Sequence, residues 1–433
     1  MSDTRFEMLA IHAGSDKPVH RIPSKLAKLS VAALLTGASA LYAQEVPVLN
    51  AGGTKISLYG FLQANAVYED GNNDGNNWTE RVPTKAEDGE GRFAFNVNQT
   101  RVGFNLAGPQ AEGKPEISGK FEIDFANNNA RNNNGVGNLR IRQSYGQVKF
   151  KDVGFTLLLG QTNDLIGPLS APTLSQSGLK ASGSLGTRRP MLRLTQALGP
   201  AEIALAATDN RDGVTLSNVD TASTHSANTT NSILPAFQGS VKVKIPATWA
   251  GEKQNLELTL GGVYGTGEPA LIKEMPDDKK KDKYPSALGG VASLAVPVIN
   301  IIGLSGEMFY GQNLKNYSDG TLNINNCRRS ADREKGCYSI GGWGALTVKL
   351  PANFSLAGGL GLESLDEDTE PGAGTASSPN PNKTMTIFGN LKYNVAETAF
   401  IGFEYANLKT DYIGDTKSGK LNRFELAFNY AFK

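Results

Sequence analysis

The feature that most constrains this chain is a repeated alternation of apolar with polar or small residues, in segments of about ten residues. In the last segment, from Arg423 to Phe432, bulky apolar residues occupy every second position and charged or small residues lie between them. A period of two residues is that of a β-strand whose two faces meet different surroundings. Beyond its first fifty positions the sequence has no run of about 18 apolar residues, so membrane-spanning helices are not expected. The pattern predicts an all-β fold.

The lengths of the segments and of their connections predict a closed barrel. The pattern gives about sixteen strands, among them one over residues 92–107. Short connections such as Lys151–Gly154 and Pro351–Asn353 alternate with long polar ones such as Asp209–Ile233. A transmembrane antiparallel β-barrel has this asymmetry, with short periplasmic turns and long extracellular loops. Closure pairs every backbone group inside the bilayer, and about sixteen strands enclose a water-filled lumen.

The charge composition limits the classes of partner. The 43 Lys and Arg residues nearly balance the 42 Asp and Glu residues, which gives a net charge of +1. A nucleic-acid partner held by bulk charge is therefore not expected. The mean hydropathy of −0.30 suits a barrel, because only the lipid-facing half of each strand has to be apolar.

The N-terminal region predicts export. Basic residues from Arg21 to Lys28 precede a short apolar stretch and a zone of small residues, which is the pattern of a secretory signal peptide with an extended N-terminus. Cleavage after Ala40 and cleavage after Ala43 both fit. We assign residues 1–43 to the signal peptide, 44–53 to a short lead, and 54–433 to the barrel.

The sequence offers little for catalysis. After the signal peptide the one remaining histidine is His225, in a polar loop, which hardly supports a Ser–His or Cys–His site. Phosphate-binding and dinucleotide-binding glycine motifs are missing, and two cysteines cannot form a structural zinc site. We expect no enzyme activity, no catalytic residue, no metal and no cofactor.

The two cysteines, Cys327 and Cys337, lie in one long predicted loop. An exported chain passes through an oxidising compartment, so a disulfide between them is expected. Two separate free thiols are the alternative.

Charged residues on the polar face of the strands are the candidates for the pore lining. Asp124 is expected opposite Arg140, and Glu122 opposite Arg142, across one antiparallel hairpin. This ladder either stiffens the wall or concentrates ionic solutes in the pore. The full set of predicted pore-lining residues is Arg101, Lys120, Glu122, Asp124, Arg140, Arg142, Arg193, Arg423 and Glu425.

A loop folded into the lumen is expected to narrow the pore. Residues 163–188 are the candidate, because the segment is long, mildly apolar and poorly alternating. Lys180, Arg188 and Arg189 are the basic residues predicted to flank this constriction.

Several motifs, taken in order, resemble the DcaP-like trimeric outer-membrane porins. They are Leu58-Tyr59-Gly60-Phe61, Gln99-Thr100-Arg101-Val102-Gly103-Phe104, Gly119-Lys120-Phe121-Glu122-Ile123-Asp124-Phe125, Leu139-Arg140-Ile141-Arg142-Gln143-Ser144-Tyr145-Gly146, Leu159-Gly160-Gln161-Thr162, Arg189-Pro190-Met191-Leu192-Arg193-Leu194-Thr195-Gln196 and Leu234-Pro235-Ala236-Phe237. The resemblance covers residues 55–245 well and implies a sixteen-stranded homotrimeric porin for small, often anionic, solutes. The closing strand also resembles those of such barrels, whose terminal aromatic residues, here Tyr430 and Phe432, are read by the assembly machinery.

The sequence therefore predicts an outer-membrane porin for passive diffusion of small hydrophilic solutes, in contact with outer-membrane lipid and lipopolysaccharide. The alternative is a structural or adhesive barrel whose long surface loops bind a partner.

Overall fold

The computed structural model divides the chain into two compact units, residues 1–42 and residues 43–433. It describes residues 48–71, 81–84, 89–127, 138–175, 177–180, 182–210, 234–249, 252–266, 286–318, 337–366, 374–375, 378–413 and 418–432. The predicted signal peptide (1–43) lies outside the described residues and stays a prediction. All that follows concerns the second unit.

The second unit is built from β-strands, with two short 3-10 helices, η2 (Lys151–Val153) and η4 (Leu314–Tyr317). The strands are β1 (Val48–Ala51), β2 (Thr54–Glu69), β3 (Arg92–Asn96), β4 (Arg101–Ala107), β5 (Glu116–Asn127), β6 (Asn138–Phe150), β7 (Phe155–Asn163), β8 (Arg188–Leu198), β9 (Ala201–Thr208), β10 (Ala236–Trp249), β11 (Glu252–Gly265), β12 (Ala287–Ile299), β13 (Ile302–Gln312), β14 (Tyr338–Lys349), β15 (Phe354–Leu365), β16 (Gly374–Thr375), β17 (Ser378–Pro379), β18 (Pro381–Ala396), β19 (Ala399–Tyr412) and β20 (Gly419–Phe432).

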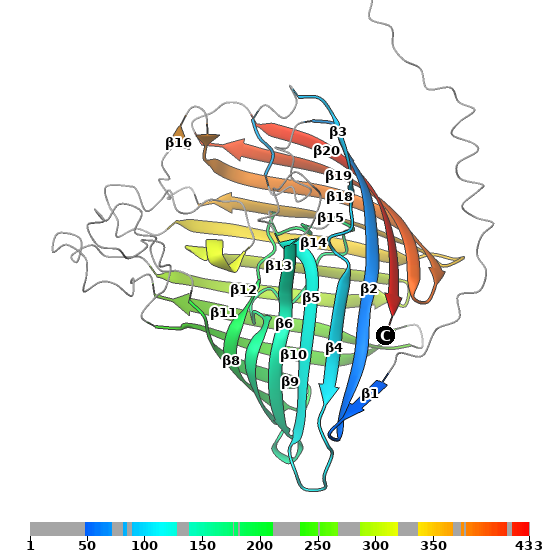
Figure 1. Cartoon of the computed structure of the whole chain (residues 1–433). Coiled ribbons are helices and arrows are strands. Elements are labelled where there is room, and N and C mark those ends of the chain that lie inside the picture. The colour runs from blue at the N-terminus through cyan, green and yellow to red at the C-terminus, as the bar shows by residue number, and fades with distance from the viewer. Residues whose placement is uncertain are drawn as a thin grey trace, which may run out of the picture. The chain divides into compact units, whose positions relative to one another are not determined.

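These strands form a closed antiparallel barrel of sixteen wall strands, as the sequence predicts. Each wall strand pairs with its neighbours in the chain, and β2 pairs with β20 from Gly60↔Phe432 to Glu69↔Arg423, which closes the ring (Figure 1). The short pair β16 and β17 forms a separate hairpin. An open sheet edge would expose backbone N–H and C=O groups to hydrocarbon, which offers them no hydrogen-bond partner. Closure of the ring pairs the described wall strands on both sides and avoids this cost.

Two details of the first strands differ from the prediction. The strand expected over residues 92–107 is interrupted, because β3 and β4 both pair with β2 and are separated by residues 97–100. Four residues there lie against three of β2, as in a β-bulge, and the Thr100 hydroxyl contacts the backbone of Gln63. In addition, the lead 44–53 contains β1, which pairs with β2 beyond the end of β20.

The alternation of the sequence separates the two faces of the wall. Along β20, Phe424, Leu426 and Phe428 are exposed on the outer face, whereas Arg423 and Glu425 are buried toward the lumen. The other wall strands likewise expose apolar side chains outward. An apolar outer band with a polar interior is what a wall between lipid and water requires.

The turns and loops gather at opposite ends of the barrel. Tight connections such as 199–200, 300–301 and 397–398 join the strands at one end, and the long loops join them at the other. Within the described residues, the structure contains no helix of the length and apolarity needed to span a membrane.

Candidate functional site

The predicted charged residues of β4, β5 and β6 meet on the inner face of the wall. The Arg140 guanidinium donates to both carboxylate oxygens of Asp124, at 2.9 and 2.8 Å. Arg142 bridges two carboxylates, with Nε 2.8 Å from Glu122 Oε1 and Nη1 2.8 Å from Asp124 Oδ2. Arg101 approaches Glu122 at 3.6 Å. We call these five residues the charge ladder.

The ladder owes part of its geometry to a β-bulge. Asp124 lies opposite Arg140 in the register, as predicted, but Glu122 lies opposite Gln143 rather than Arg142. The register shifts between Glu122 and Ile123, so Arg142 is the extra residue of β6. The bulge places the adjacent Arg142 and Gln143 on the same inner face, and this re-aims Arg142 between the two acids.

Aromatic side chains of β2 lie beside the ladder. The Tyr59 hydroxyl donates to Glu122 Oε2 at 2.8 Å, and the Lys120 ammonium lies 4.8 Å from the centre of the Tyr59 ring. The Arg101 guanidinium lies 4.9 Å from the centre of the Phe61 ring. Cation–π contacts of this kind stabilise the two cations without neutralising them.

Burial differs between the two signs of charge. The side chains of Arg101, Arg140 and Arg142 are 25%, 22% and 15% exposed, whereas those of Glu122 and Asp124 are 6% and 2% exposed. The acids therefore lie beneath the arginines, and the surface that the ladder presents to the lumen is cationic.

Arg193 adds a further cation on β8. Its inward position lies across from Leu158 of β7 and Ala206 of β9. Its Nε is buried and makes no hydrogen bond within the described part of the chain. Arg193 thus carries a positive charge toward the lumen next to apolar neighbours.

Arg423 and Glu425 do not line the pore, contrary to the prediction. Both face inward from β20, but they are 3% and 1% exposed. Arg423 donates to Glu425 Oε2 at 3.0 Å and lies 3.5 Å from Glu69, while Asn65 donates to the other oxygen of Glu425. They form a covered polar network in the wall.

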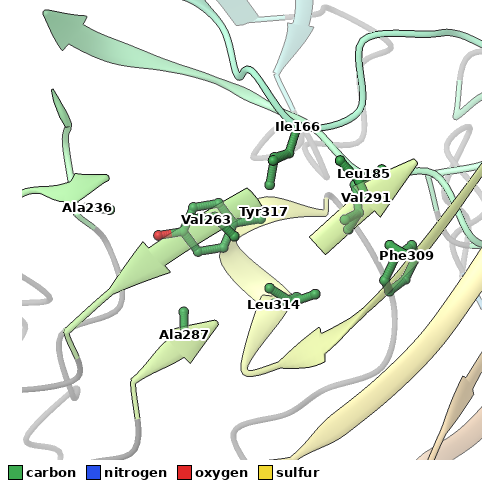
Figure 2. Packing of buried hydrophobic residues seen from close by; sticks show 9 residues of the cluster. All are labelled: Ile166, Leu185, Ala236, Val263, Ala287, Val291, Phe309, Leu314 and Tyr317. Carbon is green, nitrogen blue, oxygen red and sulfur yellow. The ribbon is translucent and has the colours of Figure 1, made fainter. Parts of the chain in front are cut away.

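Between β7 and β8, the described residues 164–175, 177–180 and 182–187 pack against the inside of the wall, and we call them the inner loop. Its Ile166 and Leu185 join a buried cluster with wall residues and with η4, and Figure 2 shows the nine members. Leu179 joins a second cluster that includes Trp343 and Phe388. Apolar burial thus attaches the inner loop to strands far from it in the sequence.

Three carboxylates between the inner loop and the wall add hydrogen bonds to this attachment. Glu404 of β19 accepts from the Thr173 hydroxyl and the Leu174 N–H, both at 2.6 Å. Glu307 of β13 accepts from the Leu185 N–H at 2.9 Å. These bonds satisfy loop N–H groups that would otherwise be buried without a partner.

Asp164 is the third carboxylate, at the base of the inner loop. It accepts hydrogen bonds from the Thr187 N–H and hydroxyl at 2.9 Å each and from Gln238 at 2.7 Å, and it forms an ion pair with Arg189, whose Nε lies 2.9 Å from Asp164 Oδ1. Arg189 also lies 4.2 Å from the centre of the Tyr317 ring and donates to the Asn316 carbonyl at 2.6 Å.

Two of the three predicted constriction cations, Arg188 and Arg189, lie elsewhere, whereas the place of Lys180 beside the constriction stays a prediction. Arg189 is 1% exposed and is a buried anchor of the inner loop rather than a pore-lining residue. Lys180 donates to the carbonyls of Leu185 and Gly186 within the loop. Arg188 lies opposite Asn163 in the register. It is an even number of residues along β8 from the exposed, outward-facing Leu192, so its position is on the outer face as well.

The sequence reasoning missed the acidic anchors Asp164, Glu307 and Glu404. Glu307 and Glu404 each interrupt an apolar stretch of a strand at an inward position, and this is the signal that could have marked them. Their partners are backbone N–H groups of a distant loop, which no local pattern reveals.

Other predicted features lie partly outside the described residues. Cys337 precedes β14, is buried and is disulfide-bonded, whereas Cys327 and His225 lie outside the described part. Tyr430 and Phe432 pair with Leu62 and Gly60 at the closing seam, and their role as an assembly signal stays a prediction. Within the described ranges, no group of three or more His, Cys, Asp or Glu residues could hold a metal ion.

A closed barrel of sixteen strands, with a loop attached inside it and a basic row on its inner wall, is the architecture of the outer-membrane porins. No family model matches the sequence, and no curated protein sequence matches it.

Solved structures share the fold. The outer membrane channel DcaP of Acinetobacter baumannii is 20% identical over 89% of this chain and 99% of its own, with a TM-score of 0.68. The anion-selective porin from Comamonas acidovorans is 10% identical over 88% of this chain and 100% of its own, with a TM-score of 0.54. OmpF of Salmonella typhi, in complex with daunomycin, is 11% identical over 89% and 100%, also with a TM-score of 0.54. The resemblance to DcaP-like porins is confirmed at the level of the fold.

Proposed function

We propose that this protein is a porin of an outer membrane, a water-filled channel through which small hydrophilic solutes diffuse passively, with a preference for anions. The observation that carries the proposal is the cationic surface of the charge ladder inside a closed barrel. Arg101, Arg140 and Arg142 cover Glu122 and Asp124, so a passing solute meets guanidinium groups first.

Selectivity follows from charge and width rather than from bond chemistry. A row of fixed cations raises the local concentration of anions and opposes cations in a narrow, partly desolvated passage. Lys120 and Arg193 extend the row along the wall, and the inner loop occupies part of the lumen. The anion-selective porin from Comamonas acidovorans, which shares the fold, supports this assignment.

The rest of the assembly is part of the same proposal. The barrel lies in contact with outer-membrane lipid and lipopolysaccharide, is inserted by the barrel assembly machinery, and associates as a homotrimer. The protein performs no enzymatic reaction and uses no cofactor. Light scattering of the detergent-solubilised protein tests the trimer, because a mass of one or two chains would contradict it.

The central test is single-channel recording in planar lipid bilayers. We expect stepwise ohmic conductance. In a potassium chloride gradient, we expect a reversal potential whose sign shows that chloride permeates more readily than potassium. Replacing Arg101, Arg140 and Arg142 together with glutamine should move the reversal potential toward potassium, because Glu122 and Asp124 then remain uncovered. The triple replacement of Arg188, Lys409 and Lys420 with glutamine is the control, because these three positions are on the outer face of the wall.

Two results would overturn the proposal. Absence of any conductance would favour the structural or adhesive barrel, whose surface loops bind a partner. A reversal potential that the triple arginine variant leaves unchanged would remove the ladder as the source of selectivity.

A further inference from the structure

A concave site lies on the inner wall at the short-turn end of the barrel, away from the charge ladder. Its volume is about 260 Å³, and it lies over β11 to β14. The polar residues around it are Asn255, Ser305, Thr347 and Lys349, and apolar lining comes from Ala295 and Pro297 among others. We call it the mouth cavity. Its size suits a small organic molecule rather than a single ion.

The shape of the mouth cavity depends on two irregularities of the wall. The register of β12 and β13 shifts between Pro297 and Ile299, which bends the wall at this end. On β13, Gly303 has no side chain, and a Cβ there would lie 2.9 Å from the Thr347 hydroxyl. The missing side chain leaves room above the strand, and the Thr347 hydroxyl donates to the Gly303 carbonyl at 3.3 Å.

Three donors around the cavity are not used by the protein itself. The Lys349 ammonium, the Asn255 amide and the Ser305 hydroxyl make no hydrogen bond or ion pair with any residue that the structure describes. Lys349 and Asn255 are exposed to the lumen. One fixed cation and two neutral donors around an apolar floor are complementary to a group that is anionic at one end and apolar at the other.

The charges nearest to the cavity support the same sign. Glu257 of β11 lies opposite Ala295 in the register and is the neighbouring acid. It is compensated by two lysines of β10, Lys242 at 3.5 Å and Lys244 at 3.6 Å. Glu202 of β9, opposite Lys242 in the register, is a second carboxylate at this end. With Lys349, three lysines therefore face two carboxylates, Glu202 and Glu257, and the excess charge is positive.

We propose that the mouth cavity binds a small organic monoanion with a compact apolar body, with its carboxylate on Lys349 and its apolar part over Ala295 and Gly303. The inference rests on the proposed function in one respect, that solute reaches the site through the lumen. It adds a second station, distinct from the ladder, that selects for apolar content as well as for charge.

The probe is cyclohexanecarboxylate, titrated calorimetrically into the detergent-solubilised full-length protein. Saturable binding is expected for this anion. The neutral cyclohexanecarboxamide, which has the same body without the charge, and acetate, which has the charge without the body, are each expected to bind at least about tenfold more weakly.

Two variants locate the site. Lys349→Gln should raise the dissociation constant about tenfold or more, because a charge-assisted hydrogen bond is lost at an exposed position where folding is not at risk. Lys244→Gln, at the same end of the barrel, is the matched control and should change it less than about threefold. Ser305→Leu fills the cavity while it keeps Lys349, and should abolish binding; heat-modifiable migration on a gel verifies that each variant is a folded barrel.

The outcomes separate this inference from the proposed function, because binding is measured in detergent whether or not the protein conducts. No saturable binding to the unaltered protein, equal binding of the carboxamide, or an equal effect of Lys244→Gln and Lys349→Gln would each overturn the mouth cavity as an anion site. Absence of conductance with intact binding would overturn the channel and leave the site standing.

Discussion

Replacing Arg189 with methionine removes one half of a buried ion pair at the base of the inner loop. The side chains of Arg189 and Asp164 are 1% and 0% exposed, and their atoms lie 2.9 Å apart. In the variant, Asp164 keeps only neutral donors, from Thr187 and Gln238. A buried charge that loses its partner costs about 3–5 kcal/mol. A detached inner loop exposes Asp164 to water and avoids this cost.

The population with a detached loop should therefore rise by about a hundredfold to several thousandfold. A reporter cysteine at Ser182 measures it, because this side chain is buried against Thr386 at 2.8 Å while the loop is attached. The rate of maleimide labelling of Ser182→Cys follows the detached population when reattachment is fast. We expect that rate to increase strongly when Arg189→Met is added.

The matched control is Arg193→Met, the same chemical change two positions along β8, at a residue that does not contact Asp164. It should leave the labelling rate nearly unchanged. Adding Asp164→Asn to Arg189→Met should bring the labelling rate most of the way back to that of the Ser182→Cys protein, because no unpaired charge is then buried. An unchanged rate in Arg189→Met, or an equal increase in the control, would refute the role of this ion pair as the anchor of the loop.

Three further predictions concern the ladder, the loop and the disulfide. Arg142→Gln uncovers both acids that Arg142 bridges. Among single ladder substitutions, it should therefore shift the reversal potential in a salt gradient furthest toward potassium. A smaller shift than that of another ladder variant would show that Arg142 is not the main source of the selectivity. Gly183→Ala should increase open-channel noise, because Gly183 has φ +98° and a Cβ there would collide with backbone carbonyls of the wall. Gly178→Ala is the control and should have a much smaller effect, because Gly178 has φ +60° but open space around it. Equal noise in the two variants would contradict the close approach of Gly183 to the wall. Cys327→Ser should leave one reactive thiol, Cys337, in the unfolded, non-reduced chain while the unaltered protein has none, as counted by mass spectrometry after alkylation; two alkylated cysteines in the unaltered protein would exclude the disulfide.

The sequence by itself determined the barrel, because the physical cause is local. Each strand between lipid and water has to alternate apolar with polar residues. The sequence of one strand therefore predicts that Phe424 faces outward and Arg423 inward, without information on the neighbouring strands. The hairpin that pairs Asp124 with Arg140 was predictable for the same reason, since its partners are close in the chain and the register follows from the pattern. The inner loop was also marked by its failure to alternate.

Only the tertiary structure decided which inward residues meet water. Parity places Arg423 and Arg189 on the inner side of the wall, but what covers them comes from distant parts of the chain, so a cation expected in the pore becomes a buried partner of a carboxylate. The bulge at Arg142 is likewise a property of strand pairing, and it moves one guanidinium between two acids. Alternation is a rule about one strand and its two faces, whereas exposure depends on every segment packed against that face. For this reason the sequence determined the wall, and the packing of the inner loop and the register of the strands determined the surface that a solute meets.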